Sequence, residues 1–214
     1  NAGQTVTTGV QNTLIGAQAG DALTDADFNI AIGTDALGAD TLGSRSIAIG
    51  RRALLTQNFT TATDAYNVAV GFEAGHNITT GTSNTLIGGL SGDAITTGAD
   101  NTAVGVNSLG ANTTGANNVA VGKAALDANT TGGSNTALGT DALSADTLGS
   151  RNTAVGTSAL EVQNFTTATN SYNTAMGFNA GAAVTTGVQN TFIGGLSGDA
   201  ATTRDGNTAV GYAS

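Results

Sequence analysis

Few residues in this sequence could do chemistry. His76 is the only histidine, and the chain has no cysteine. A nucleophilic triad or a zinc site needs a histidine or a thiolate with partners in a recognisable arrangement, and His76 has none in the sequence. The P-loop and dinucleotide-binding glycine patterns are also missing. We therefore expect no enzymatic activity and no cofactor.

Carboxylates are the other side chains that could do chemistry, by binding a metal ion. Asp21, Asp25 and Asp27 lie close together, and further aspartates recur between the apolar segments. Calcium binds carboxylate and carbonyl oxygens, but no EF-hand loop is present. We interpret these aspartates as solvated surface residues and predict no metal site, with calcium as the alternative.

Two short segments carry the best candidates for ligand contact. Residues 57–67 read QNFTTATDAYN, and residues 163–173 read QNFTTATNSYN. Both lie where an otherwise regular repeat has a four-residue insertion, so we expect loops that project Phe59, Tyr66, Phe165 and Tyr172. Exposed aromatic rings there would suit stacking on sugars or gripping a protein. The alternative is that they only cap the edge of the fold.

The elements that must position these residues are copies of one pentapeptide. Its order is Asn, then Thr, Ile or Val, then Ala, Leu or Phe, then Ile, Val, Leu or Met, then Gly, and it occurs twelve times. Successive motif glycines are 17 residues apart, except for steps of 21 residues from Gly50 to Gly71 and from Gly156 to Gly177. Ser46 replaces the leading asparagine once, and the other copies have Asn12, Asn29, Asn67, Asn84, Asn101, Asn118, Asn135, Asn152, Asn173, Asn190 and Asn207.

A longer period of 106 residues lies above this repeat, so residues 1–214 form one array with two halves, at about 1–106 and 107–212. Residues 1–16 nearly repeat residues 179–194, which leads us to expect a fragment of a longer fibre.

Each unit holds one short apolar segment bounded by Gly, Asn and Thr, which predicts a short strand and turns rather than a helix. Stacking the units gives the predicted fold: an all-β parallel β-solenoid of twelve coils. Adjacent strand residues point to opposite faces, so the third and fourth motif positions lie on different sides. The fourth position forms a column for the trimer interface or the core: Ile15, Ile32, Ile49, Val70, Ile87, Val104, Val121, Leu138, Val155, Met176, Ile193 and Val210.

The third position and a later residue are expected to share the core volume. Where the third position is large, as in Leu86, a glycine such as Gly92 follows, and where it is alanine, leucine usually follows. Two coils have small residues at both places, and there we expect Phe72 and Phe178 to fill the core. The asparagine column is predicted to form a ladder of side-chain amides at the turn.

A strand that is apolar on both faces indicates that its outer face meets another chain, and a homotrimer is the economical solution. The net charge is -9 with only 6 Lys or Arg, so we expect no nucleic acid partner. No apolar run approaches the roughly 18 residues of a membrane span, so we expect no membrane insertion of this segment.

The twelve Asn-Thr-Ala-Val-Gly-like motifs resemble the head repeats of YadA-like trimeric autotransporter adhesins and similar β-solenoid repeats of phage tail fibres. The resemblance covers essentially the whole chain. It implies a left-handed β-roll, assembled as a homotrimer, outside the cell on a bacterial surface or on a virion tail.

The sequence therefore predicts an extracellular fibre segment that acts in adhesion or receptor binding, with a host-surface glycan or protein as partner. A purely structural shaft without ligand binding is the first alternative. An ice-binding β-solenoid is the second, because threonine pairs recur in many turns.

Overall fold

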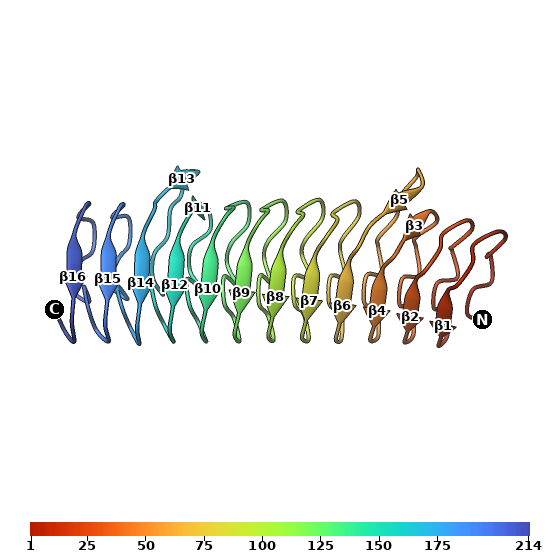
Figure 1. Ribbon diagram of the computed structural model, residues 1–214, viewed down its shortest axis with the longest axis horizontal. Helices are drawn as coiled ribbons and strands as arrows, with labels where there is room; N and C mark the ends of the chain where they lie inside the picture. The colour runs from red at the N-terminus through yellow and green to blue at the C-terminus, as the bar shows by residue number, and fades with distance from the viewer.

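In a computed structural model that describes all 214 residues, the chain forms a straight rod of stacked coils with its two ends at opposite ends of the rod (Figure 1). Twelve three-residue strands form one sheet, and each pairs in parallel and in register with the next, as Ala103 does with Ala120. The prediction of an all-β parallel β-solenoid of twelve coils is confirmed. The strands are β1 (Thr13–Ile15), β2 (Ile30–Ile32), β4 (Ile47–Ile49), β6 (Val68–Val70), β7 (Thr85–Ile87), β8 (Thr102–Val104), β9 (Val119–Val121), β10 (Thr136–Leu138), β12 (Thr153–Val155), β14 (Thr174–Met176), β15 (Thr191–Ile193) and β16 (Thr208–Val210).

The two longer coils add small sheets away from the main one. β3 (Gly43–Ser44) pairs in parallel with β5 (Thr63–Asp64), and β11 (Gly149–Ser150) pairs with β13 (Thr169–Asn170). Both insertions rise from the same side of the rod, at two separate places along it (Figure 1). No helix capable of crossing a lipid bilayer is present.

The motif glycine is required because successive coils touch there. All twelve motif glycines have φ between +127° and +145°. A Cβ on Gly122 would lie 2.5 Å from the carbonyl oxygen of Gly139 in the next coil. Any side chain would therefore both strain the backbone and separate the coils.

Each coil also bends at left-handed residues that are not glycine. In the coil that follows Gly105, φ is +57° at Asn107, +53° at Leu109 and +59° at Asn117. This conformation is uncommon for residues with a side chain, and it persists only where the surrounding structure fixes it. Here the hydrogen bonds to the adjacent coils supply that constraint, as in the 3.0 Å bond from the Leu109 amide to the Ala125 carbonyl.

The core is a narrow channel lined by three columns of side chains. The first is the middle residue of each strand. The second lies four residues after the motif glycine, and the third lies seven residues after it. Six coils combine leucine in the second column with a polar residue in the third: Leu37 and Asp40, Leu54 and Gln57, Leu109 and Asn112, Leu126 and Asn129, Leu143 and Asp146, Leu160 and Gln163. Five coils combine glycine with an apolar residue: Gly20 and Leu23, Gly75 and Ile78, Gly92 and Ile95, Gly181 and Val184, Gly198 and Ala201.

The expected roles of Phe72 and Phe178 in the core are wrong, because their side chains are 49% and 59% exposed. The missing volume comes from the third column and from adjacent coils. A Cβ on Gly75 would lie 2.8 Å from Leu86 Cδ1 and 3.2 Å from Ile78 Cδ1, so that space is already filled. Volume is conserved across coils as well as within each one, as close packing requires.

We predict that Gly92→Leu lowers the free energy of unfolding by about 1 to 3 kcal/mol, because the new side chain overlaps Leu86 and Ile95. Adding Leu86→Ala and Ile95→Asn recreates the Ala103, Leu109 and Asn112 combination and should recover most of the loss. Urea unfolding of the single and triple variants measures this. A triple variant less stable than the single one would contradict the account of the core.

Candidate functional site

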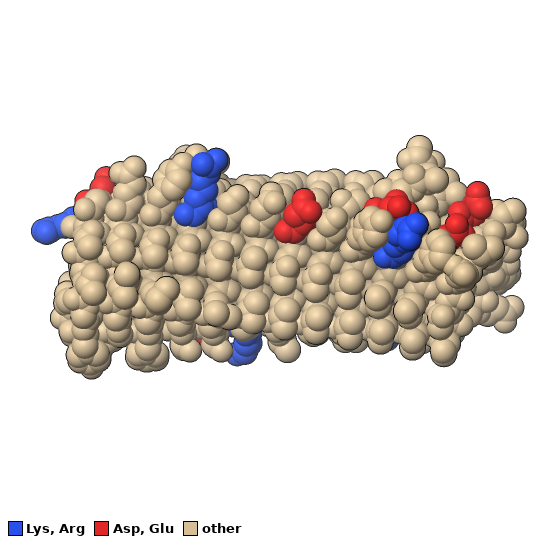
Figure 2. All heavy atoms as spheres, viewed as in Figure 1, with Lys and Arg blue, Asp and Glu red and all other residues tan.

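The outer face of the main sheet extends along the whole rod. The first and third residues of each strand point outward, and in all twelve strands they are threonine, aliphatic residues or methionine, without one charge. In Figure 2 the charged side chains lie along the upper rim and at one point on the lower edge, and the broad band between them is uncharged. The face is therefore uncharged from one end of the rod to the other, with threonine in part of one column and aliphatic residues or methionine at the other outward positions.

The predicted fourth-position column forms one half of this face. None of its members is buried in the single chain: Ile87 is 40% exposed, Leu138 46% and Met176 46%, and others such as Val104 and Val121 are half-buried. The alternative that this column forms the core is wrong. The third motif position, as in Ala103 and Ala120, takes that role.

The asparagine column lies inside the rod, next to the strand. Asn118 is fully buried, and its Nδ2 donates to the carbonyl of Gly132 at 2.9 Å. Its Oδ1 accepts the backbone N–H of Asn135 at 3.0 Å, and its own N–H donates to Asn101 Oδ1 at 3.0 Å. Most rungs are joined in this way, through side chain and backbone. Direct bonds between amides also occur, as from Asn101 Nδ2 to Asn84 Oδ1 at 3.1 Å.

A buried carboxylate anchors each insertion. Asp40 Oδ1 accepts the backbone N–H groups of Gly43 and Phe59 at 3.0 and 3.1 Å, and Oδ2 accepts Gln57 Nε2 at 2.6 Å. Gln57 Nε2 also lies 3.0 Å from Ser46 Oγ, so the serine that replaces the motif asparagine belongs to this network. In the second half Asp146 holds Gly149, Phe165 and Gln163 in the same way.

Burial raises the pKa of Asp40 and Asp146 above the ordinary 3.8, while hydrogen bonds from Gln57 and Gln163 and from backbone N–H groups oppose this rise. The desolvation of the carboxylate is the larger effect. Each insertion is thus fixed at its base by a carboxyl group that folding makes harder to ionise.

The expectation that Phe59 and Phe165 project from the insertions is wrong. Their side chains are only 5% and 6% exposed. Phe59 packs against Gly43, where an added Cβ would lie 2.7 Å from its Cδ2. The two phenylalanines therefore stabilise the insertions from within.

Tyr66 and Tyr172 do lie at the surface, 54% and 47% exposed. Tyr66 is grouped with two residues that the sequence analysis missed. The guanidinium carbon of Arg45 lies 5.9 Å from the Tyr66 ring centre and 4.8 Å from that of Phe28. Arg45 Nε contacts Asp64 Oδ1 at 2.9 Å. The sequence does contain a signal for this group. Phe28, Arg45 and Tyr66 all directly precede the first motif position, so stacking of the coils places them next to one another.

The remaining titratable residues include His76 and two half-buried aspartates. His76 lies 4.0 Å from Glu73, and no group of three or more His, Cys, Asp or Glu could hold a metal ion. Asp93 and Asp127 line a shallow hollow on either side of Gly110, and burial raises the pKa of both carboxyls.

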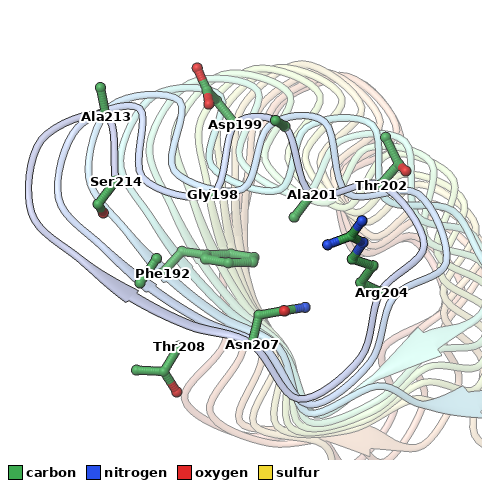
Figure 3. Close-up of a pocket in the computed structure, with 12 residues that line it drawn as sticks. Phe192, Gly198, Asp199, Ala201, Thr202, Arg204, Asn207, Thr208, Ala213 and Ser214 are labelled. Atoms are coloured by element: carbon green, nitrogen blue, oxygen red, sulfur yellow. The ribbon is translucent and has the colours of Figure 1, made fainter.

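The largest hollow, about 650 Å³, is the end of the core channel. Figure 3 shows Phe192, Ala201 and Asn207 around this opening. They belong to the same columns that fill the interior of the other coils. The hollow is therefore lined in part by core side chains, together with polar residues that include Asp199 and Arg204.

No protein-family model, no curated protein and no solved structure matches this chain. The assignment of function therefore depends on the surfaces described above.

We predict that Asn118→Ala lowers the free energy of unfolding by about 2 kcal/mol or more. The change leaves the buried N–H of Asn135 without a partner and removes one of the two donors to the Gly132 carbonyl, which then keeps only Asn129 Nδ2. The matched control is the neighbouring Asn117→Gly. Asn117 is exposed with φ at +59°, which glycine adopts freely, so this change should cost little. Chemical unfolding of both variants tests the ladder, and equal losses would contradict it.

We predict that Asp40→Asn with Asp146→Asn weakens the pH dependence of stability. Because the folded pKa values are raised above 3.8, the folded state holds these protons more tightly than the unfolded state. Their contribution to stability is therefore greatest below pH 3.8 and is lost as the pH rises through the folded pKa values. Asparagine does not titrate, and Asn112 and Asn129 already occupy the same core position.

Urea unfolding of the parent and the double variant across this pH range measures the difference in slope. The parent should lose more stability than the variant as the pH rises. Identical slopes would show that the two buried carboxyls titrate alike in the folded and unfolded chains.

Proposed function

We propose that this chain is a segment of an extracellular fibre that acts in adhesion, similar to YadA-like adhesin heads or phage tail-fibre repeats. In this proposal the rod is a left-handed β-roll, and three copies assemble through the outer faces of their main sheets. The uncharged outer face, repeated in all twelve coils, is the observation that carries the proposal.

A second copy of the chain is the partner that fits this face best. The face repeats once per coil, at the strand spacing of about 4.8 Å, and extends along the whole rod. A globular partner would cover only part of it, whereas a parallel copy has the same repeat and the same length. The net charge of -9 does not oppose this contact, because no charged residue belongs to the strands of the main sheet.

The apolar character of the face also favours burial in an assembly. Contiguous exposed apolar patches larger than a few hundred Å² are rare on soluble monomers and mark interaction surfaces. The single chain has few large aromatic residues inside, so contacts between copies would add substantially to its stability.

The insertions support the adhesive role. They are the only breaks in the regular coil, they lie on one side of the rod, and the exposed Tyr66 and Tyr172 lie at the end of each longer coil, just before its strand. A rigid shaft that repeats these features in each half and in each copy would present several contact sites at once. Such multivalent display raises the effective affinity of weak single sites.

A structural shaft without ligand binding and an ice-binding solenoid remain the competing functions. The second has one supporting observation: threonine is the first strand residue in eight of the twelve coils, as in Thr102, Thr136 and Thr153. The Thr-Thr turns favour it less, because hydroxyls such as that of Thr96 donate to the carbonyl of the next coil. Thermal hysteresis of the purified chain would favour ice binding, and its absence would dismiss it.

We predict a sedimentation mass of three chains in analytical ultracentrifugation. Val104→Glu with Val121→Glu should reduce it to the mass of one chain, because charges on the outer face would be desolvated in the assembly. Thr97→Glu with Thr114→Glu, at exposed turn positions, is the matched control and should leave the trimer intact. A parent protein that sediments as one chain at micromolar concentration would overturn the proposed assembly.

A further inference from the structure

We propose that Phe28, Arg45, Asp64 and Tyr66, here called the Arg45 ledge, bind a neutral pyranose sugar. The inference rests on the proposed adhesive role, since it names the site and the ligand class. The ledge lies beside the first insertion, where β3 and β5 leave the main rod. It contains no strand residue of the main sheet; Phe28, Arg45 and Tyr66 lie two residues before β2, β4 and β6, at the corner beside the outer face.

The conformation of these residues is the first argument. The residue before the motif asparagine is left-handed in every coil, with φ at +60° for Phe28, +63° for Arg45 and +51° for Tyr66. Outside these three coils the position holds small or polar residues such as Ser83 and Asn117, with the aromatic Tyr172 as the one exception. Bulky side chains tolerate this conformation poorly, and these three gain little burial in return. Burial in the core therefore does not account for their presence on three successive coils.

The second argument is the arrangement of the side chains. The guanidinium group of Arg45 lies over both rings, at 4.8 Å from Phe28 and 5.9 Å from Tyr66. Its Nε contacts Asp64 at 2.9 Å, and the pKa of Arg45 is raised, chiefly by that hydrogen bond. The Nη atoms make no hydrogen bond within the chain. Packing and the ion pair thus hold a planar donor group in place while its two ends remain available.

The third argument is the space next to Tyr66. Arg45 lies over one face of the ring, and the coil on the other side offers Ser83, which is small and exposed. A sugar ring could therefore stack on the free face of Tyr66. Its hydroxyls would accept from Arg45 Nη and donate to the carboxylate of Asp64, both of which are about half exposed.

The charges of the ledge select among sugars. Arg45 is the one cation there, and Asp64 and Asp27 act on it as neighbouring anions. A sialic acid or a uronate would bring a further negative charge to a chain that already carries -9. The site therefore suits a neutral hexopyranose with one apolar face, whose recognition uses stacking and paired hydroxyl contacts.

The second half of the chain supplies an internal comparison. There Arg151 lies 5.6 Å from the Tyr172 ring and donates from Nη1 to the Tyr172 hydroxyl at 3.0 Å. Ser134 stands where the first half has Phe28, and Asn170 where it has Asp64. One aromatic ring, the carboxylate and a free Nη donor are thus lost, and Gln189 replaces the small Ser83. We infer that only the first half binds the sugar.

The experiment applies the labelled full chain to an array of neutral and sialylated oligosaccharides, followed by titration of the best neutral one. Tyr66→Ala should weaken its affinity about tenfold, the loss expected for one stacked ring, whereas Tyr172→Ala should stay within about twofold of the parent. Tyr66→Phe keeps the ring and should retain most of the affinity. Phe28→Ser with Asp64→Asn, which copies the second half, should abolish measurable binding.

Unfolding midpoints and sedimentation masses of the same variants show whether each is folded and assembled. Three results would each overturn the proposed sugar site. The chain binds no neutral sugar, it binds acidic sugars in preference, or Tyr66→Ala and Tyr172→Ala lose the same amount of affinity. If the trimer is intact but no sugar binds, the proposed sugar site is wrong and the proposed fibre assembly is unaffected. Sugar binding that depends on Tyr66, in a chain that sediments as a monomer, would support the sugar site and overturn the proposed assembly.

Discussion

Contact between successive coils is the constraint on which the rest of the structure depends. Backbone N–H and carbonyl groups bond from coil to coil along the whole rod, and at every motif glycine from Gly16 to Gly194 the backbones approach too closely for any side chain. Because the next coil repeats the same geometry, one residue type at one position recurs as a column. Each column then has a uniform environment, either inside the channel or on one face of the rod.

Polar groups inside this rod are as important as apolar ones. The channel is too narrow for a large apolar core, so buried asparagines satisfy backbone groups of the adjacent coil and fix the turn beside each strand. At the insertions, where the regular coil is interrupted, Asp40 and Asp146 take over this function and bind the displaced backbone. Burying a carboxyl group is unfavourable, but here its hydrogen bonds to the displaced backbone hold an irregular segment in place.

The same regularity divides the surface into regions with different uses. The main sheet presents threonine and aliphatic side chains without charge, which suits contact with an identical rod. The corner before each strand is left-handed and turned outward, so it can carry diverse side chains without disturbing the core. The Arg45 ledge occupies this corner in the first half, and Arg151 with Tyr172 forms a reduced counterpart in the second half.

The sequence by itself determined the coil number, the strand positions and the placement of the third and fourth motif positions on opposite faces, because a fixed period and a strand alternation of two leave little freedom. It also indicated the asparagine column. Only the structure showed that the third position faces the core and the fourth faces outward. Only the tertiary structure decided that Phe59, Phe165 and the residue seven after each motif glycine lie inside, and that Phe72 and Phe178 lie outside. It alone brought Phe28 and Arg45 to Tyr66. Loop side chains take their direction from left-handed turns and from space left by adjacent coils, and neither is encoded in a simple period.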